Sequence, residues 1–403
     1  MELEHAYKLL GILAGIVFLY TLIAKRIENS CLSGPMVYVT LGLILGPLGF
    51  ALIGNTSQAS STRLLIDITL ALILFSDAAH SNITVLKKKV VYPTRMLLLG
   101  LPASILLGFI AAAVLFNQLS LLEAAILATM LAATDAALGK AVVTNEQVPA
   151  AVREGLNVES GLNDGLCVPI LLLLISMASA GASDHFNSFS GLIIFAKELG
   201  IGAMVGLGMA YLGAKLLFWS QSKQWLSEVW CQLTVAAMAL CSLGLAQAME
   251  GSGYIAAFSG GLLFGHLMKR NTHKLVLTTE SLAELMAMLT WIVFGAVVVS
   301  TVYTAFSLSM VLYAIISLTL IRMLPVYLCF AGTKVPSQHR LFMGWFGPRG
   351  LASIVFAIIV IDAELPNSNF IALTVTCTVL LSLVLHGISA KPMAQRLANK
   401  TDK

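Results

Sequence analysis

Long apolar stretches separated by short polar ones run through almost the whole chain of 403 residues. A helix needs about 20 apolar residues to cross a bilayer, and this pattern predicts about thirteen such spans. They fall at residues 9–24, 37–53, 64–79, 96–116, 121–143, 156–180, 192–219, 229–248, 251–268, 282–302, 308–331, 341–361 and 370–390. The pattern therefore predicts an all-α polytopic membrane protein with about 13 transmembrane helices.

Composition supports this assignment. Hydrophobic residues make up 58% of the chain and charged residues only 11%, whereas a soluble domain has about 25% charged residues. A soluble or purely structural protein is therefore excluded. The net charge of +4 does not indicate nucleic-acid binding, because the basic residues are spread over many loops. The expected surroundings are the lipid bilayer.

Basic residues concentrate in alternate loops, including residues 25–26, 87–89, 269–274 and the tail at 391–403. By the positive-inside rule the N-terminus is extracytoplasmic and the C-terminus cytoplasmic, which requires an odd number of crossings. The first apolar segment runs directly into Lys25 without a small-residue cleavage site, so it is expected to be a span and not a signal peptide. We predict a multi-pass protein of the cell (inner) membrane.

The most informative stretch is residues 156–169, where Glu159, Asn163 and Asp164 interrupt an apolar span. Ionisable groups inside a membrane are costly and usually mark an ion or proton path. The pairs Glu159/Asn163 and Ser160/Asp164 are spaced i, i+4, which places them on one side of a helix. Their oxygens suit a hard cation such as sodium. Asp164 is the first candidate for a cation-binding carboxylate.

A second carboxylate, Asp135, lies inside the fifth apolar stretch next to Thr134. In secondary transporters, helices interrupted at mid-membrane point their ends at the binding site. Asp135 could neutralise the positive N-terminal ends of such half-helices, and Thr134 could offer an oxygen to the cation. Asp77 lies near the end of the third stretch, before three lysines. It is either an accessory acidic residue or a carboxylate that reaches the basic interface.

Two arginines also lie within spans. Arg322 needs a carboxylate partner, because desolvating either ion alone costs several kcal/mol; the alternative is that it reaches the membrane surface. Arg349 belongs to the sequence Gly347-Pro348-Arg349-Gly350, which cannot form a regular helix centre. It could neutralise negative half-helix C-termini. One interrupted span in each half, acidic in one and basic in the other, is typical of an inverted-repeat transporter.

The sequence Glu-Ser-Gly-Leu-Asn-Asp at 159–164, together with Gly-Pro-Arg-Gly at 347–350, resembles the cation:proton antiporter family 1. This family contains the NhaP-type bacterial sodium/proton antiporters and the animal sodium/hydrogen exchangers. The resemblance implies that Asp164 binds either the cation or the proton, that Glu159 pairs with Arg322, and that the protein is a homodimer. The family usually has Pro-Thr-Asp where this chain has Ala133-Thr134-Asp135, so the first helix break rests on the resemblance.

The domain organisation expected is a transmembrane antiporter domain at residues 1–390 and a short cytoplasmic tail at 391–403. Within the domain, halves at about 1–180 and 229–390 would flank a linker span at 192–219. His266 and His273 fall at the predicted cytoplasmic edge, where they could sense pH, although surface histidines usually have no such role.

The function predicted is sodium/proton antiport in pH homeostasis. Asp164 would exchange one cation for one proton by alternating access, electroneutrally, with Asn163, Asp135, Thr134 and Ser160 as further ligands. Desolvation favours the neutral form of a carboxyl group, which lets a proton compete with the cation. Potassium/proton antiport and a passive cation channel are the alternatives. We expect no enzyme activity and no cofactor; an intramembrane aspartyl protease would require a Gly-x-Gly-Asp motif, and Asp164 follows Gly161-Leu162-Asn163.

Overall fold

The computed structural model describes residues 2–28, 30, 32–53, 59–80, 91–135, 138, 142, 145, 148–182 and 188–401. All regular structure within these ranges is helical, which confirms the all-α prediction. The lysines at 87–89 and Lys140 lie outside the described residues.

The first part of the chain, up to Ser222, is built of helices. They are α1 (Glu2–Glu28), α2 (Gly34–Leu45), α3 (Ala59–His80), α5 (Val91–Arg95), a π-helical segment (Met96–Gly100), α6 (Leu101–Leu115), α7 (Leu121–Met130), α9 (Ala150–Ala182) and α10 (Ser188–Ser222).

The second part of the chain is also built of helices. They are α11 (Glu228–Ala248), α12 (Gly253–Met268), a short 3-10 turn (Lys269–Asn271), α13 (Thr272–Val293), a π-helical segment (Phe294–Val299), α14 (Ser300–Val302), α15 (Leu308–Ile316), a π-helical segment (Ser317–Ile321), α16 (Arg322–Cys329), α17 (Ser337–Trp345), α18 (Leu351–Asp362) and α19 (Ser368–Thr401).

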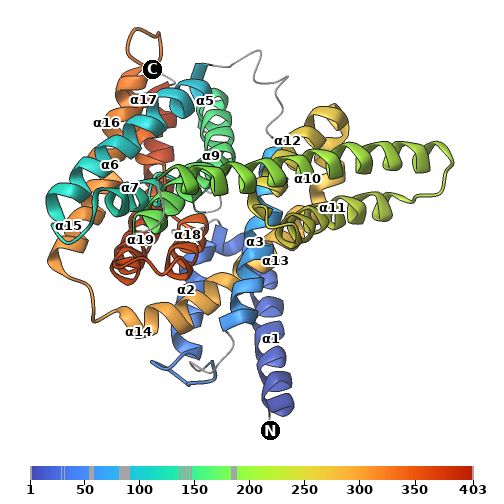
Figure 1. The fold of residues 1–403 in the computed structure, drawn as a ribbon, viewed down its shortest axis with the longest axis horizontal. Coiled ribbons are helices and arrows are strands. Elements are labelled where there is room, and N and C mark those ends of the chain that lie inside the picture. The colour runs from blue at the N-terminus through green and yellow to red at the C-terminus, as the bar shows by residue number, and fades with distance from the viewer. Residues whose placement is uncertain are drawn as a thin grey trace.

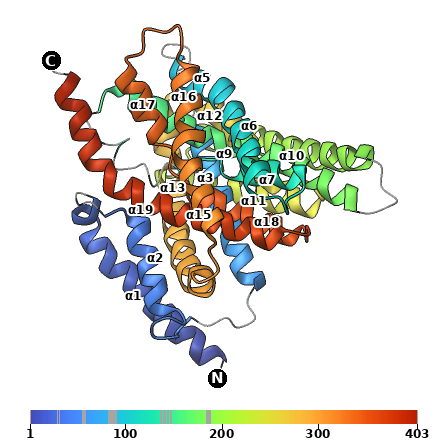
Figure 2. The same ribbon diagram turned by 90° about the vertical axis from the view of Figure 1, so that its left-hand side faces the viewer.

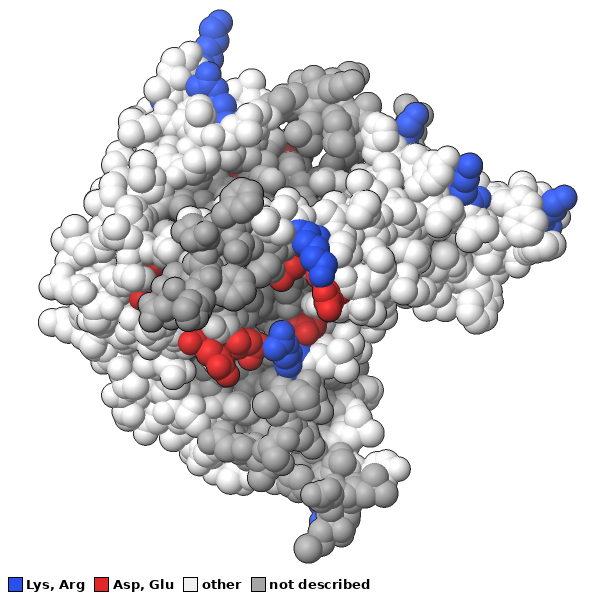
Figure 3. Space-filling model, viewed as in Figure 1, with Lys and Arg blue, Asp and Glu red and all other residues white. Residues whose placement is uncertain are grey.

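Eight helical stretches of the described chain are long and apolar enough to cross a membrane, and four shorter apolar helices of 10–17 residues accompany them. The protein is therefore a multi-pass membrane protein. The count of thirteen crossings stays a prediction. On the face shown in Figure 3 most of the described surface is uncharged, and acidic and basic side chains gather around a hollow near its centre.

The helices form two groups, with α9 between them (Figure 1). In one group α3 packs against α12 and α13, and α10 packs against α11 and α12. In the other group α7 packs against α6, α16 against α17, and α19 against α15 and α18. Helix α9 contacts α7 on one side and α10 on the other. The chain termini lie at opposite ends of the molecule in both views (Figures 1 and 2).

Two segments are interrupted. Helix α7 ends at Met130 and residues 131–135 have no regular helix, while α17 ends at Trp345 and α18 begins only at Leu351. The second break follows from Pro348 and its flanking glycines, which remove a hydrogen-bond donor and loosen the backbone. The first has no proline, so tertiary contacts must hold it open. One is direct: the Asp135 amide donates to the Pro348 carbonyl at 2.8 Å.

Candidate functional site

Helix α9 presents Glu159, Ser160, Asn163 and Asp164 within the protein interior. Its glycines permit close approach of neighbouring helices. A Cβ at Gly161 would lie 3.0 Å from the Asp77 Cβ of α3, and a Cβ at Gly165 would overlap the Phe258 ring at 2.1 Å. The motif is thus packed directly against α3 and α12.

A buried ion pair anchors the motif. Arg322 donates from Nη1 to Glu159 Oε1 at 2.7 Å and from Nη2 to Oε2 at 2.9 Å. Each side chain is only 1% exposed, and this two-pronged geometry is the strong form of an arginine–carboxylate contact. Arg322 follows directly on the π-helical segment at Ser317–Ile321, a distortion common at functional sites. The structure therefore directs Arg322 inward to Glu159.

The same carboxylate connects to the first interruption through Asn163. The Asn163 amide donates from Nδ2 to Thr134 Oγ1 at 2.5 Å and to Glu159 Oε1 at 3.2 Å. Its oxygen accepts from the Thr134 backbone amide at 3.3 Å. Ser160 Oγ donates to the Thr134 carbonyl at 2.7 Å. These bonds hold the non-helical segment against α9, so Asn163 and Ser160 have a clear role in shaping the site.

The two interruptions compensate each other's charges. Asp135 accepts from the backbone amide of Leu351, the first residue of α18, at 2.8 Å. Arg349 donates from Nη1 to the carbonyls of Ala132 and Ala133, beyond the end of α7, at 3.5 and 3.4 Å. A carboxylate thus lies at a positive helix N-terminus and a guanidinium at a negative C-terminus, which are the favourable positions.

Asp164 differs from these neighbours. It is 6% exposed, and its Oδ1 is buried without a hydrogen-bond partner among the described residues. The charges of Asp77, Asp135, Glu159 and Arg349 are close enough to act on it. A buried polar atom without a partner is costly, so this oxygen is where a proton or a cation would be stabilised.

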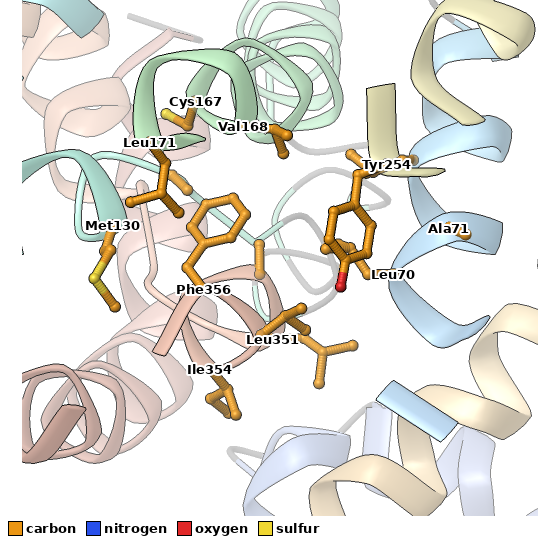
Figure 4. Close-up of a cluster of buried hydrophobic side chains, with 14 of the residues drawn as sticks. Leu70, Ala71, Met130, Cys167, Val168, Leu171, Tyr254, Leu351, Ile354 and Phe356 are labelled. Carbon is orange, nitrogen blue, oxygen red and sulfur yellow. The ribbon is translucent and has the colours of Figure 1, made fainter. Parts of the chain in front are cut away.

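Apolar side chains close one side of Asp164. Cys167, Val168 and Leu171 follow it at i+3, i+4 and i+7, and therefore extend the same face of α9 toward its C-terminal end. Leu171 lies beside the ring of Phe356 of α18, Val168 points between this ring and the ring of Tyr254, and Leu70 of α3 lies next to Tyr254 (Figure 4). All six are buried. The described side chains that continue this face of α9 toward its C-terminal end are therefore apolar and buried.

Beyond this apolar layer is a polar cluster that the sequence did not reveal. The Tyr254 hydroxyl donates to Asp67 Oδ1 at 2.6 Å, and Arg63 forms ion pairs with both Asp67 and Asp362. Only the i, i+4 spacing of Arg63 and Asp67 could have been found from the sequence. These contacts join α3, α12 and α18.

Two serines that stabilise the interruptions were also missed. Ser353 Oγ donates to the carbonyl of Met130, the last residue of α7, at 2.9 Å, and Ser382 Oγ accepts from the Arg349 amide at 2.7 Å. Serine inside an apolar helix gives no distinctive signal, because it often donates to its own helix.

Comparisons with known proteins agree with this architecture. A family model described as sodium/hydrogen exchanger, transmembrane, matches residues 13–396. The K(+)/H(+) antiporter NhaP of Alkalimonas amylolytica is 26% identical over 405 residues, which is 99% of this chain and 68% of the relative. The Na(+)/H(+) antiporter NhaH of Halobacillus dabanensis is 27% identical over 314 residues, covering 73% of each protein.

Among solved structures, the sodium proton antiporter MjNhaP1 from Methanocaldococcus jannaschii at pH 8 has a TM-score of 0.77 and 23% identity, covering 98% of this chain and 99% of that one. This similarity shows the fold. The resemblance noted from the motifs is confirmed by the match to the family model, and the chain belongs to the sodium/hydrogen exchanger family.

Proposed function

We propose that this exchanger binds its cation and its proton in turn on the carboxylate of Asp164. The observation that supports this most directly is the buried Oδ1 without a partner among the described residues. In contrast, Glu159 is engaged by Arg322, and Asp135 is engaged by the start of α18. Asp164 is the acidic group of the motif with an oxygen left for a ligand.

The ligand set for the cation comes from the same place. Asp164 would supply a carboxylate oxygen, Ser160 a hydroxyl oxygen one helical turn away, and Thr134 a carbonyl oxygen that lies 2.7 Å from Ser160 Oγ. Asp135 and Asn163 would complete the surroundings chiefly by holding the interrupted segment in position. Oxygen ligands suit sodium as well as potassium. Relatives named for either ion occur, so they leave both ions open; we keep sodium, the ion expected from the sequence motifs, as the proposed substrate and potassium as the alternative.

Access to the site would alternate between the two membrane faces. Val168, Leu171 and Phe356 belong to one buried apolar cluster, and this layer would cover Asp164 toward the C-terminal end of α9. Asp77 lies on the opposite side, against Gly161. The conformation is therefore proposed to open toward the end of the molecule where α9 begins, the cytoplasmic end under the predicted orientation. The reverse state requires the Tyr254–Asp67 and Arg63–Asp362 contacts to separate.

The test is cation-induced proton movement in proteoliposomes, followed with a pH-sensitive dye at zero membrane potential. Asp164→Asn removes the titratable group with little change in shape, and exchange should fall to the level of empty liposomes. Glu228→Gln, at an exposed acidic residue of α11, is the matched control and should exchange normally. Sodium and potassium gradients tested separately identify the substrate.

Two outcomes would contradict the proposal. Exchange by Asp164→Asn at the wild-type rate would move the binding group to Asp135 or Asp77. Cation flux that follows voltage without proton movement would indicate a channel.

A further inference from the structure

A second group of titratable side chains lies outside the proposed exchange site. His80 is the last residue of α3, His273 is the second residue of α13, and Glu280 follows His273 at i+7 on the same face. One ligand atom from each of the three lies within 4.8 Å of the others. The closest pair is His80 Nδ1 and Glu280 Oε1 at 3.2 Å.

These distances suit a metal ion. Zinc binds imidazole nitrogen and carboxylate oxygen at about 2.0–2.2 Å, so two ligand atoms on one tetrahedral ion lie about 3.4 Å apart. The separation of 3.2 Å between His80 and Glu280 already matches. The rings of His80 and His273 are 5.7 Å apart between centroids, edge to face. His273 is exposed, so its side chain can rotate to bring its nitrogen nearer.

The hydrogen bonds of His80 allow a metal ion to replace the proton on its Nδ1. Its Nδ1 lies 3.0 Å from the Ser76 carbonyl as well as 3.2 Å from Glu280. Both neighbours are acceptors, so this nitrogen carries a proton when no ion is bound. Its Nε2 has no hydrogen-bond partner among the described residues, so no bond at that atom opposes reorientation of the ring. An ion would take the place of the proton between nitrogen and carboxylate.

The cluster lies near the proposed route to Asp164. His80 is three residues after Asp77 on α3, hence on a neighbouring face one turn further along. Asp77 in turn packs against Gly161 of the α9 motif, and the charge of Glu280 acts on Asp77. A doubly charged ion held here would repel a monovalent cation that approaches Asp164 by this route.

We propose that His80, His273 and Glu280 bind a divalent transition-metal ion of the zinc class. Two histidines and one glutamate form a ligand set known from zinc sites in which the fourth position is left to water. Binding inhibits exchange by placing positive charge at the entrance. The binding rests on these three side chains alone, whereas the inhibition also rests on the function proposed for Asp164.

Binding is measured first, with purified protein free of any histidine tag. Cobalt(II), used as a spectroscopic substitute for zinc, should give the visible absorption of a tetrahedral site at one ion per chain, and zinc should displace it. His273→Ala and Glu280→Gln should each weaken zinc binding at least about tenfold in calorimetry. His266→Ala, at an exposed histidine of α12 outside the cluster, should not. The proposal would be overturned if His273→Ala and Glu280→Gln bound zinc as tightly as His266→Ala, or if wild type showed no saturable binding.

Inhibition is measured next in the proteoliposome assay, with zinc added on the side to which this end of the molecule faces. Wild type should be inhibited and Glu280→Gln should resist. Zinc binding without any exchange in wild type would contradict the proposed function and leave the metal site standing. Exchange that zinc inhibits equally in wild type and Glu280→Gln would refute the role of the site.

Discussion

The buried pair of Glu159 and Arg322 yields a quantitative prediction that separates two ways of breaking it. Both side chains are 1% exposed, and two hydrogen bonds of 2.7 and 2.9 Å connect them. Glu159→Gln leaves a guanidinium that cannot lose its proton. An uncompensated buried charge costs about 3–5 kcal/mol. We expect destabilisation of this size, unchanged between pH 5 and pH 8.

Arg322→Met leaves a carboxylate, which can escape by taking up a proton. That uptake becomes easier by about 1.4 kcal/mol for each unit by which the pH is lowered. The glutamate also keeps the bond from Asn163 Nδ2 at 3.2 Å. Arg322→Met should therefore be about as harmful as Glu159→Gln at pH 8 and clearly less harmful at pH 5. The double variant buries no charge and should be more stable than Glu159→Gln alone.

The assay is thermal unfolding in detergent, followed by tryptophan fluorescence and checked by size-exclusion chromatography at each pH. The four proteins form a double-mutant cycle, which isolates the coupling between the two side chains. Equal destabilisation of Arg322→Met at pH 5 and pH 8 would show that proton uptake does not relieve the carboxylate. A double variant no more stable than Glu159→Gln would show that the buried charge is not the cause.

Two further predictions concern the interruptions and the charge moved. Gly350→Ala would place a Cβ 1.8 Å from Asp135 Oδ2, so exchange should be lost and the protein destabilised by about 1–3 kcal/mol. The control is Gly208→Ala in α10, where a Cβ meets nothing within 4 Å. Exchange should move one cation per proton, so its rate should not respond to an imposed membrane potential and no current should appear on a solid-supported membrane. A rate that depends on the potential would instead require a second proton per cation.

Much of the site was predictable because charge is expensive in an apolar span. Asp164 stood out for that reason alone, and a buried arginine such as Arg322 must lie near a carboxylate. Pro348 and its glycines marked the second interruption locally. The first interruption had no local signal, because the amide of Asp135 is held by the carbonyl of Pro348, more than 200 residues away in the sequence.

Side-chain orientation could not be predicted in the same way. The spacing of Asn163 showed that it shares a face with Glu159, but not that its amide would bond Thr134 at both ends. Tyr254 and Asp67 meet only because α3 and α12 pack together. The packing of α3 on α13 likewise brings His80 to Glu280. Pairs of this kind depend on helix packing, which one sequence does not specify.

The charges around Asp164 support the proposed exchange of one cation for one proton. Glu159 and Arg322 cancel each other as an ion pair. Asp135 lies at the start of α18, and Arg349 reaches the end of α7. Each of these two charges faces a helix end of opposite sign that carries about half a charge, and the two side-chain charges themselves sum to zero. Under the proposed function, Asp164 is then the charge of the motif that is left for a ligand, with one monovalent cation or one proton as its partner. Under this proposal the two ligands neutralise the same carboxylate, so the loaded site would have equal charge in both forms and the membrane potential would do no net work over a full cycle.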